Sequence, residues 1–503
     1  MSYATKAATG IGWMFTSSAS TQGVVLLANM VLARLLIPAD FGAVALVLAL
    51  ISILQTFAEM GMAVALIQRE QVNKSLIDSA FSATACLTLS IFAILWASSS
   101  FIAGFFELPV LVGLLKIAAI SYFFNGIFSL YRCLLLRDLR YKDISIVGFG
   151  NVILSSSVSI FLAYHGYGPY SIVWGSLLAG ACVLTAGLVL TKYIPRTLGS
   201  FREMRSLFSF GIWVSVGRIM GDAAGKVDAF VIGKVLDAAT LGGYYMAQKI
   251  VLLIPATFTG IIDQVMFPIY SKFQKDKERV KEGYFKTLSL SATVLLPPIC
   301  LIFTFADPLV RIMLGKQWLY ITPLVMIMSI FGIFQAIGGG IFASVIYSLG
   351  RPQLATLVNA FRMAALPVFV IVGSKWGVFG VAWGFALYGV FGRLFNQWLL
   401  KYFFDFSLIK YFKSIFPAAL SSAIATLPAY LISSILAKGS LWSMISWNIA
   451  ALLVWGVMYL IFIRLLAKQD LAYFVTIGLP ILQKTAAYSF FLRVQKKCGF
   501  SCG

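Results

Sequence analysis

Charged residues are scarce in this chain: they make up 11% of its 503 residues, against 60% hydrophobic residues. A soluble protein carries about 25% charged residues, so the composition excludes an ordinary soluble domain. Apolar runs of about 20 residues recur from one end of the chain to the other, and a helix of that length spans a bilayer. A transmembrane β-barrel would instead show segments of about 10 residues with alternating polarity. The sequence therefore predicts an all-α polytopic membrane protein.

Residues on which many enzymes depend are also missing. The chain has one histidine, His165, and no nucleotide-binding P-loop, which argues against a histidine-based catalytic site and against ATP drive within this chain. The last two of its six cysteines lie in the tail CGFSCG, at a spacing unlike that of zinc sites or CxxC motifs. The predicted outer loops are too short to form a catalytic domain. We therefore expect no enzyme activity, no metal and no cofactor.

Clusters of proline and glycine, such as IPADFG, GYGP and SLGRP, separate the apolar runs. About fourteen transmembrane helices are predicted between these breaks. They cover residues 8–33, 41–66, 78–103, 110–134, 144–164, 169–191, 207–234, 241–268, 285–306, 319–348, 353–373, 377–400, 411–436 and 442–463.

The net charge of +21 has a topological explanation that needs no nucleic acid. With the N-terminus in the cytoplasm, 26 of the 39 Lys and Arg residues fall in cytoplasmic loops or the tail, 6 in outer loops and 7 within spans. Cytoplasmic loops carry an excess of Lys and Arg. The sequence therefore predicts a multi-pass protein with both termini in the cytoplasm.

The chain contains an internal repeat. LARLLIPADFG (Leu32–Gly42) matches IGKVLDAATLG (Ile232–Gly242) at an offset of 200, and GPYSIVWGSLLAG (Gly168–Gly180) matches GVFGVAWGFALYG (Gly377–Gly389) at an offset of 209. Because six spans separate the copies, both have the same orientation. Parallel repeats are typical of transporters with a site between the halves, although a duplication without a transport role would leave the same pattern. We predict an N-lobe at 1–200, a C-lobe at 201–405, two further helices at 406–465 and a basic cytoplasmic tail at 466–503.

The segment SVGRIMGDAAGKVDAF (Ser215–Phe230) places charges inside the seventh predicted span. At 100° per residue, Arg218, Asp222 and Lys226 share one face of a helix and form i,i+4 pairs of opposite sign. Asp228 points elsewhere and is assigned to the outer end. A charged stripe cannot face lipid, so it either joins helices as a polar network or lines a wet cavity.

Basic residues outnumber acidic residues within the spans. A cavity with surplus positive charge favours an anionic ligand, and the arginine fork suits a diphosphate. Lys249 and Arg393 lie near predicted span ends, where long side chains reach the interface. The predicted substrate-binding residues are Arg218, Lys226, Lys249, Arg362 and Arg393, and the predicted coupling or ion-pair residues are Glu59, Asp222 and Asp263.

Several segments resemble a known family. They are GWMFTSSASTQGVVLLANMVLARLLIPADFGAVAL, FAEMGMAVALIQRE, FNGIFSLYRCLLLRDLRYKDIS, LGGYYMAQKIVLLIPATFTGIIDQVMFPIYSKFQKD and LGKQWLYITPLV. In this order they resemble bacterial polysaccharide flippases and exporters, in the polysaccharide transporter branch of the MOP superfamily. The colanic acid and exopolysaccharide exporter group (Wzx-type) is the most similar. Glu59 occupies the acidic position of the family's F-x-D/E-x-G segment.

The resemblance implies a MOP/MATE-like fold of two parallel six-helix lobes plus two C-terminal helices. It implies a flippase that moves polyprenyl-diphosphate-linked oligosaccharide across the inner membrane for exopolysaccharide or lipopolysaccharide synthesis, by alternating access driven by an ion gradient. Its partners would be that substrate, membrane lipids, and candidate polymerase and chain-length or export proteins.

Four alternatives stay open. A flippase for the peptidoglycan lipid precursor would share the anionic headgroup. A multidrug or cation exporter of the same superfamily would need an acidic cavity, whereas the surplus here is basic. A membrane glycosyltransferase or polymerase would need external loops and clustered carboxylates, which the sequence lacks. A scaffold protein without transport activity is the fourth.

Overall fold

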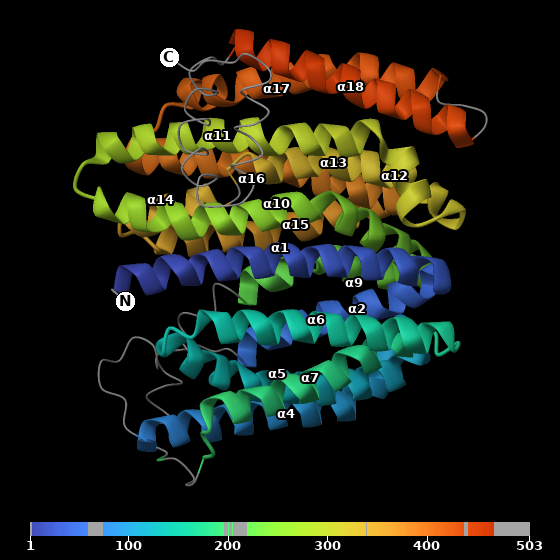
Figure 1. Cartoon of the computed structure of the whole chain (residues 1–503), viewed down its shortest axis with the longest axis vertical. Helices are drawn as coiled ribbons and strands as arrows, with labels where there is room; N and C mark the ends of the chain where they lie inside the picture. The colour runs from blue at the N-terminus through green and yellow to red at the C-terminus, as the bar shows by residue number, and fades with distance from the viewer. Residues whose placement is uncertain are drawn as a thin grey trace. The chain divides into compact units, whose positions relative to one another are not determined.

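The structure is a computed structural model that describes residues 3–58, 74–195, 200, 204, 219–338, 340–436 and 441–466. Within these residues every regular element is helical (Figure 1). Eleven helices of this described part are long and apolar enough to cross a membrane. The prediction of an all-α polytopic membrane protein is confirmed, while the number of fourteen spans remains a prediction.

The helix bounds follow the predicted spans closely in most of the chain. The first group is α1 (Tyr3–Leu35), α2 (Pro38–Ala58), α4 (Lys74–Phe106), α5 (Val110–Arg137), α6 (Tyr141–Tyr164), α7 (Tyr170–Thr191) and α9 (Val227–Val235). The second group is α10 (Ala238–Lys272), α11 (Lys277–Thr304), α12 (Ala306–Met313), α13 (Thr322–Ala336), α14 (Ile341–Ser348), α15 (Gln353–Ser374), α16 (Gly377–Phe404), α17 (Leu408–Leu431) and α18 (Leu441–Leu466).

One predicted span proves to be divided. The region 319–348 contains the 3-10 helix η1 (Lys316–Ile321), then α13, and then α14. The interruption between α13 and α14 includes Gly338, whose φ of 84° lies in the left-handed region that glycine adopts without steric strain. The stretch Lys316–Ser348 has a high mean hydropathy of 2.0, which is why the sequence alone predicts one span there.

Contacts between helices divide the chain into two compact units. The first unit comprises Met1–Leu253, Leu309–Met328 and Pro352–Gly392, and the second comprises Ile254–Pro308, Ser329–Arg351 and Arg393–Gly503. In the first unit α1 packs on α6, α4 and α7 pack on α5, and α9 packs on α2 and α15. In the second unit α11 packs on α17, and α17 packs on α18, which runs beside it in Figure 1.

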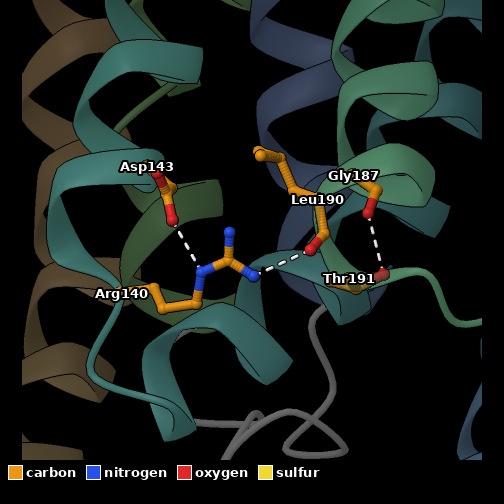
Figure 2. A network of polar contacts seen from close by, with 5 residues as sticks. All are labelled: Arg140, Asp143, Gly187, Leu190 and Thr191. Carbon is orange, nitrogen blue, oxygen red and sulfur yellow. Dashed lines mark hydrogen bonds and ion pairs between the residues drawn. The ribbon is translucent and has the colours of Figure 1, made fainter.

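Arg140 joins three helices of the first unit at their ends (Figure 2). It lies in the turn between α5 and α6, where its Nε donates to Oδ2 of Asp143 at 2.6 Å. One terminal nitrogen donates to the carbonyl oxygen of Leu190, near the end of α7, at 2.7 Å. The hydroxyl of Thr191 donates to the carbonyl of Gly187 in the same turn. A basic residue predicted for a cytoplasmic loop therefore also satisfies a carbonyl at a helix end.

The two segments of the first repeat lie against each other. The break between α1 and α2 spans Leu35 to Pro38, and the break between α9 and α10 spans Val235 to Ala238, again at an offset of 200. A Cβ atom on Gly42 would overlap the carbonyl oxygen of Ala238, and one on Gly242 would overlap that of Pro38. The first turns of α2 and α10 are thus in reciprocal backbone contact, which only glycine permits.

The second repeat also has a structural counterpart. Gly168 and Gly377, the first residues of the matched segments, both have positive φ, 55° and 71°. Farther along, a Cβ atom on Gly175 would collide with the Ser155 carbonyl of α6, and one on Gly384 with the Phe369 carbonyl of α15. The matched glycines therefore make the same two features in both copies: a left-handed residue before a helix and close packing on the preceding helix.

Replacement of Gly42 tests the reciprocal contact. We expect Gly42→Ala to lower the free energy of unfolding by roughly 1–3 kcal/mol, because the new methyl group meets backbone that cannot rotate away. The matched control is Gly23→Ala in α1, where a Cβ atom meets nothing within 4 Å and helix propensity favours alanine by roughly 0.5–1 kcal/mol. Thermal unfolding of the purified protein measures both. Equal stability of the two variants would contradict the contact.

Candidate functional site

The seventh predicted span is interrupted at the residues that carry its charge. Residues 219–224 are helical, Gly225 and Lys226 form a turn, and α9 then begins at Val227. The Lys226 amide donates to the carbonyl of Ala223, three residues earlier, whereas an α-helix would use the carbonyl of Asp222. The backbone therefore forms a tighter, 3-10-like turn at this point. The predicted stripe assumed one continuous helix. That assumption is wrong at Lys226, whose direction is set by the turn.

Helix α15 supplies a second cation to this turn. A terminal nitrogen of Arg362 lies 2.9 Å from the position that a Cβ atom on Gly225 would occupy, so glycine makes room for the guanidinium. One turn earlier on α15, Asn359 lies against Gly221 in the same way. The Nε atom of Arg362 is buried and has no hydrogen-bond partner among the described residues. The structure thus brings the predicted residues Arg362 and Lys226 to one turn.

Lys226 lines a cavity of about 280 Å³ inside the first unit. Helix α2 contributes Ser52 and Gln55, and α10 contributes Tyr245 and Gln248. The remaining lining residues are Ala45, Leu48, Ala49, Ile51, Asp228, Ala229, Leu241 and Tyr244. The lining therefore combines one cation, one carboxylate, two amides and two phenol rings with apolar walls, an arrangement typical of ligand sites.

Asp228 is a functional candidate whose surroundings the sequence analysis did not identify. It was assigned to the outer end of the span, and the structure shows that it is 2% exposed and forms part of the cavity wall. Its Oδ2 accepts hydrogen bonds from the hydroxyl of Tyr244 at 2.9 Å and the amide of Gln248 at 3.1 Å. Tyr244 and Gln248 are four residues apart on α10, a helical spacing that could have suggested the pair, although not its partner.

The predicted coupling residue Asp222 has a different environment. It is exposed, and its Oδ2 accepts a hydrogen bond from the hydroxyl of Thr56 on α2 at 2.6 Å. Among the ion pairs of the described residues none joins Asp222 to Lys226. The predicted i,i+4 pairing of these two residues is therefore wrong, because the turn at Gly225 separates them.

Lys249 lies in the same unit but outside the cavity lining. Its Nζ donates to the side-chain oxygen of Asn29 on α1 at 2.9 Å and lies 5.1 Å from the centre of the Tyr245 ring. A second, smaller cavity of about 30 Å³ beside it has mainly apolar walls, including Met30 and Leu253. Lys249 therefore joins α10 to α1 in this structure.

Arg393 belongs to the second unit, where its guanidinium is already bound by protein. Its Nε donates to the carbonyl of Phe334 at 2.7 Å, and its terminal nitrogens donate to the carbonyl of Gly338 and the side chain of Gln335. These acceptors lie at the end of α13, where the helix leaves carbonyl groups without intrahelical partners. The contacts give Arg393 a structural role that the sequence did not suggest.

The side chains of the remaining predicted site residues lie outside the part of the chain that the structure describes. Glu59 and Arg218 lie outside the described residues, and for Asp263 only the backbone, within α10, is described. Their assignments remain predictions.

Outside the membrane spans, one ion pair joins the ends of two helices of the first unit, α9 and α4. The Nζ of Lys234, at the end of α9, donates to Oε1 of Glu107 at 2.8 Å and lies over the ring of Phe105. The hydrogen bond and the charge of Lys234 lower the pKa of Glu107. Arg34, the repeat counterpart of Lys234, instead donates to the carbonyl of Ile312.

Comparison with known sequences places the chain in a family. The family described as "Polysaccharide biosynthesis protein" matches residues 31–323, which is more than half of the chain. The chain belongs to this polysaccharide biosynthesis family. The match confirms the resemblance to polysaccharide flippases of the MOP superfamily, a family of membrane transporters rather than enzymes.

Two bacterial relatives illustrate the family. The teichuronic acid biosynthesis protein TuaB of Bacillus subtilis (strain 168) is 26% identical over 384 residues, which cover 75% of this chain and 79% of TuaB. The lipopolysaccharide biosynthesis protein WzxC of Escherichia coli (strain K12) is 23% identical over 403 residues, which cover 80% of this chain and 82% of WzxC.

Solved structures identify the fold of this polysaccharide biosynthesis protein. The lipid II flippase MurJ in an inward closed conformation superposes with a TM-score of 0.72 at 16% identity, over 90% of this chain and 98% of MurJ. An inward-facing multidrug MATE transporter of the MOP superfamily gives a TM-score of 0.60 at 14% identity, over 76% of this chain and 95% of the transporter. The predicted MOP/MATE-like fold is confirmed at this level.

The contacts of Arg393 lead to a stability prediction. We expect Arg393→Met to lower the free energy of unfolding by roughly 2–5 kcal/mol, because charged hydrogen bonds are lost and two carbonyls lose their donor. The control is Arg351→Met in the same unit, where an exposed guanidinium only stacks on Phe403 and contributes about 0.5–1 kcal/mol. Thermal unfolding compares the two. A loss no greater than that of the control would contradict a structural role for Arg393.

Proposed function

We propose that this protein is a flippase that moves a polyprenyl-diphosphate-linked oligosaccharide from the inner to the outer leaflet of the cytoplasmic membrane. It does so by alternating access between two parallel lobes of six helices, with two appended C-terminal helices and both termini in the cytoplasm. The translocated unit serves exopolysaccharide or lipopolysaccharide synthesis. A polysaccharide polymerase and chain-length or export proteins are its candidate partners.

The observation that carries this proposal is the approach of Arg362 to the turn of Lys226. The two cations reach one place from α15 and from the start of α9, and the Nε of Arg362 is buried without a partner among the described residues. An unsatisfied buried donor costs roughly 1–3 kcal/mol, and more when the group is charged. A ligand that supplies anionic oxygen atoms at this turn would remove that cost.

A diphosphate fits the chemistry of the two side chains. It carries several acceptor oxygens, so one group accepts hydrogen bonds from the planar guanidinium of Arg362 while another faces the ammonium of Lys226. The hydroxyl-rich oligosaccharide needs uncharged hydrogen-bonding groups and flat apolar faces. The amides of Gln55 and Gln248 and the ring of Tyr245 in the adjoining cavity wall are of that kind.

Flux measurements with purified protein in liposomes test the proposal. We expect wild type to translocate a fluorescent polyprenyl-diphosphate-linked oligosaccharide. We expect Lys226→Gln and Arg362→Gln each to weaken apparent substrate affinity about ten- to a hundredfold, because a hydrogen bond to a charged group contributes about 1.5–3 kcal/mol. The control is Lys234→Gln, which removes a cation that pairs with Glu107 outside the cavity and leaves flux unchanged.

The outcomes separate the site from the function. If wild type moves the lipid and both cavity variants match Lys234→Gln, the headgroup site lies elsewhere. If wild type moves only a peptidoglycan-type precursor, the oligosaccharide class is wrong. If it exports organic cations and no lipid, the flippase proposal is wrong.

A further inference from the structure

Asp228 is a buried carboxylate that has no role in the proposed binding of the diphosphate headgroup. It lies near the start of α9, is 2% exposed, and accepts three hydrogen bonds. Oδ1 accepts from the backbone amide of Ala229 at 2.9 Å, and Oδ2 accepts from Tyr244 and Gln248 of α10. All three donors are uncharged, and Tyr244 is itself 1% exposed.

The charge of Asp228 is therefore balanced only at a distance. The charged residues on α9, its cap and the elements packed against it are Lys226, Lys234, Arg362 on α15, Asp40 on α2, Lys74 and Asp78 on α4, Glu107 just beyond α4, and Lys249, Asp263 and Lys272 on α10. Of these residues only Lys226 shares the cavity wall with Asp228. No ion pair of Asp228 is among those of the described residues. Burial disfavours the charged form of a carboxylate, and three neutral donors offset that cost without a neighbouring ion pair.

The cavity supplies a place from which a proton could arrive. Asp228 forms part of its wall, together with the polar side chains of Ser52 and Gln55. A volume of about 280 Å³ exceeds that of a single water molecule, which occupies about 30 Å³ in the liquid. Buried acidic groups that line such cavities in membrane proteins are typical of proton pathways.

We propose that Asp228 is the proton-binding site that couples this transporter to a proton gradient. Tyr244 and Gln248 are the partners whose hydrogen bonds change when Asp228 gains or loses its charge. This inference rests on the proposed transport function and specifies its driving ion. A water-borne proton bonds to Oδ2 of Asp228, and the only bond that breaks is the O–H bond of the donating hydronium ion. The neutral carboxyl group then donates to the oxygen of Tyr244, whose own hydrogen turns toward the cavity.

The consequence is a change in the contact between α9 and α10. In the charged state one oxygen atom accepts from two side chains of α10; in the neutral state that oxygen carries a proton and one of the two hydrogen bonds reverses or is lost. The two protonation states therefore favour different strengths of the α9–α10 contact, which is what coupling requires. Asp222 lacks this property because it is exposed and bonded only to Thr56 among the described contacts.

The first test measures lipid flux in liposomes with and without an imposed pH gradient, acidic on the outer side. We expect wild type to accumulate up to about tenfold more substrate per pH unit for each coupled proton. Asp228→Asn abolishes this stimulation, which is expressed as the ratio of its flux with the gradient to its own flux without one. The matched control is Asp237→Asn, a carboxylate that bonds Thr240 at the start of α10, where asparagine also caps a helix; it keeps the stimulation.

A second measurement needs no transport and no substrate. Infrared spectroscopy of wild type in lipid nanodiscs during a pH titration reports the C=O band of a protonated carboxyl group. We expect this band to disappear in Asp228→Asn. In Tyr244→Phe its midpoint moves to higher pH by about one to two units, because a hydrogen bond of roughly 1.5–3 kcal/mol to the charged form is lost.

Each outcome decides one question. Gradient stimulation in Asp228→Asn equal to that in Asp237→Asn overturns the coupling role, as does a wild type whose flux ignores the gradient. An unshifted midpoint in Tyr244→Phe shows that the network only packs α9 on α10, and it remains informative if Asp228→Asn does not fold. A titrating Asp228 band in a protein that moves no lipid-linked oligosaccharide supports the proton site and overturns the proposed function instead.

Discussion

Lipid cannot hydrate a charged or polar group, and the arrangement of this protein depends on that constraint. Two polar side chains of the first unit bond a side chain from another helical segment: Thr56 bonds Asp222, and Lys249 bonds Asn29. Arg393 does the same in the second unit with carbonyls at the end of α13. Arg362 and Asp228 differ, because the first has a buried nitrogen without a described partner and the second has neutral partners only. Arg362 at the charged turn and Asp228 in the cavity wall are the functional candidates for these reasons.

The cavity that contains Lys226 and Asp228 is lined mainly by residues of α2, α9 and α10, next to the contact between the repeat-related segments. Gly42 and Gly242 bring the repeat-related first turns of α2 and α10 into backbone contact. The lining of the cavity begins at Ala45 on α2 and Leu241 on α10, directly next to this contact. The same glycines that allow the copies to pack thus fix one boundary of the cavity. Side chains have diverged around this shared backbone, since Arg34 bonds a carbonyl and Lys234 pairs with Glu107.

Helix positions could be predicted from the sequence because hydropathy and Gly or Pro breaks are local signals. The span predicted at 353–373 is α15 (Gln353–Ser374), and the one at 169–191 is α7 (Tyr170–Thr191). The contact at the Gly225 turn could not be predicted in this way, because the guanidinium that lies against it belongs to Arg362, more than a hundred residues away. The surroundings of Asp228 were missed for the same reason: its partners Tyr244 and Gln248 lie on the next helix, and no periodicity within its own helix indicates them.

Lys226 and Asp228, the two charged residues of the cavity, have different proposed roles because their surroundings differ. Lys226 caps α9 beside a glycine turn, next to a guanidinium of the same sign, so an anion at that turn lowers the repulsion between the two cations. Asp228 lies two residues later, near the start of α9, and its hydrogen-bond partners on α10 respond to its protonation rather than to a ligand. A bound anion near Lys226 would weaken the attraction between Lys226 and the Asp228 carboxylate and so favour the neutral carboxyl group. The anion and the proton therefore influence each other's binding electrostatically through a single lysine.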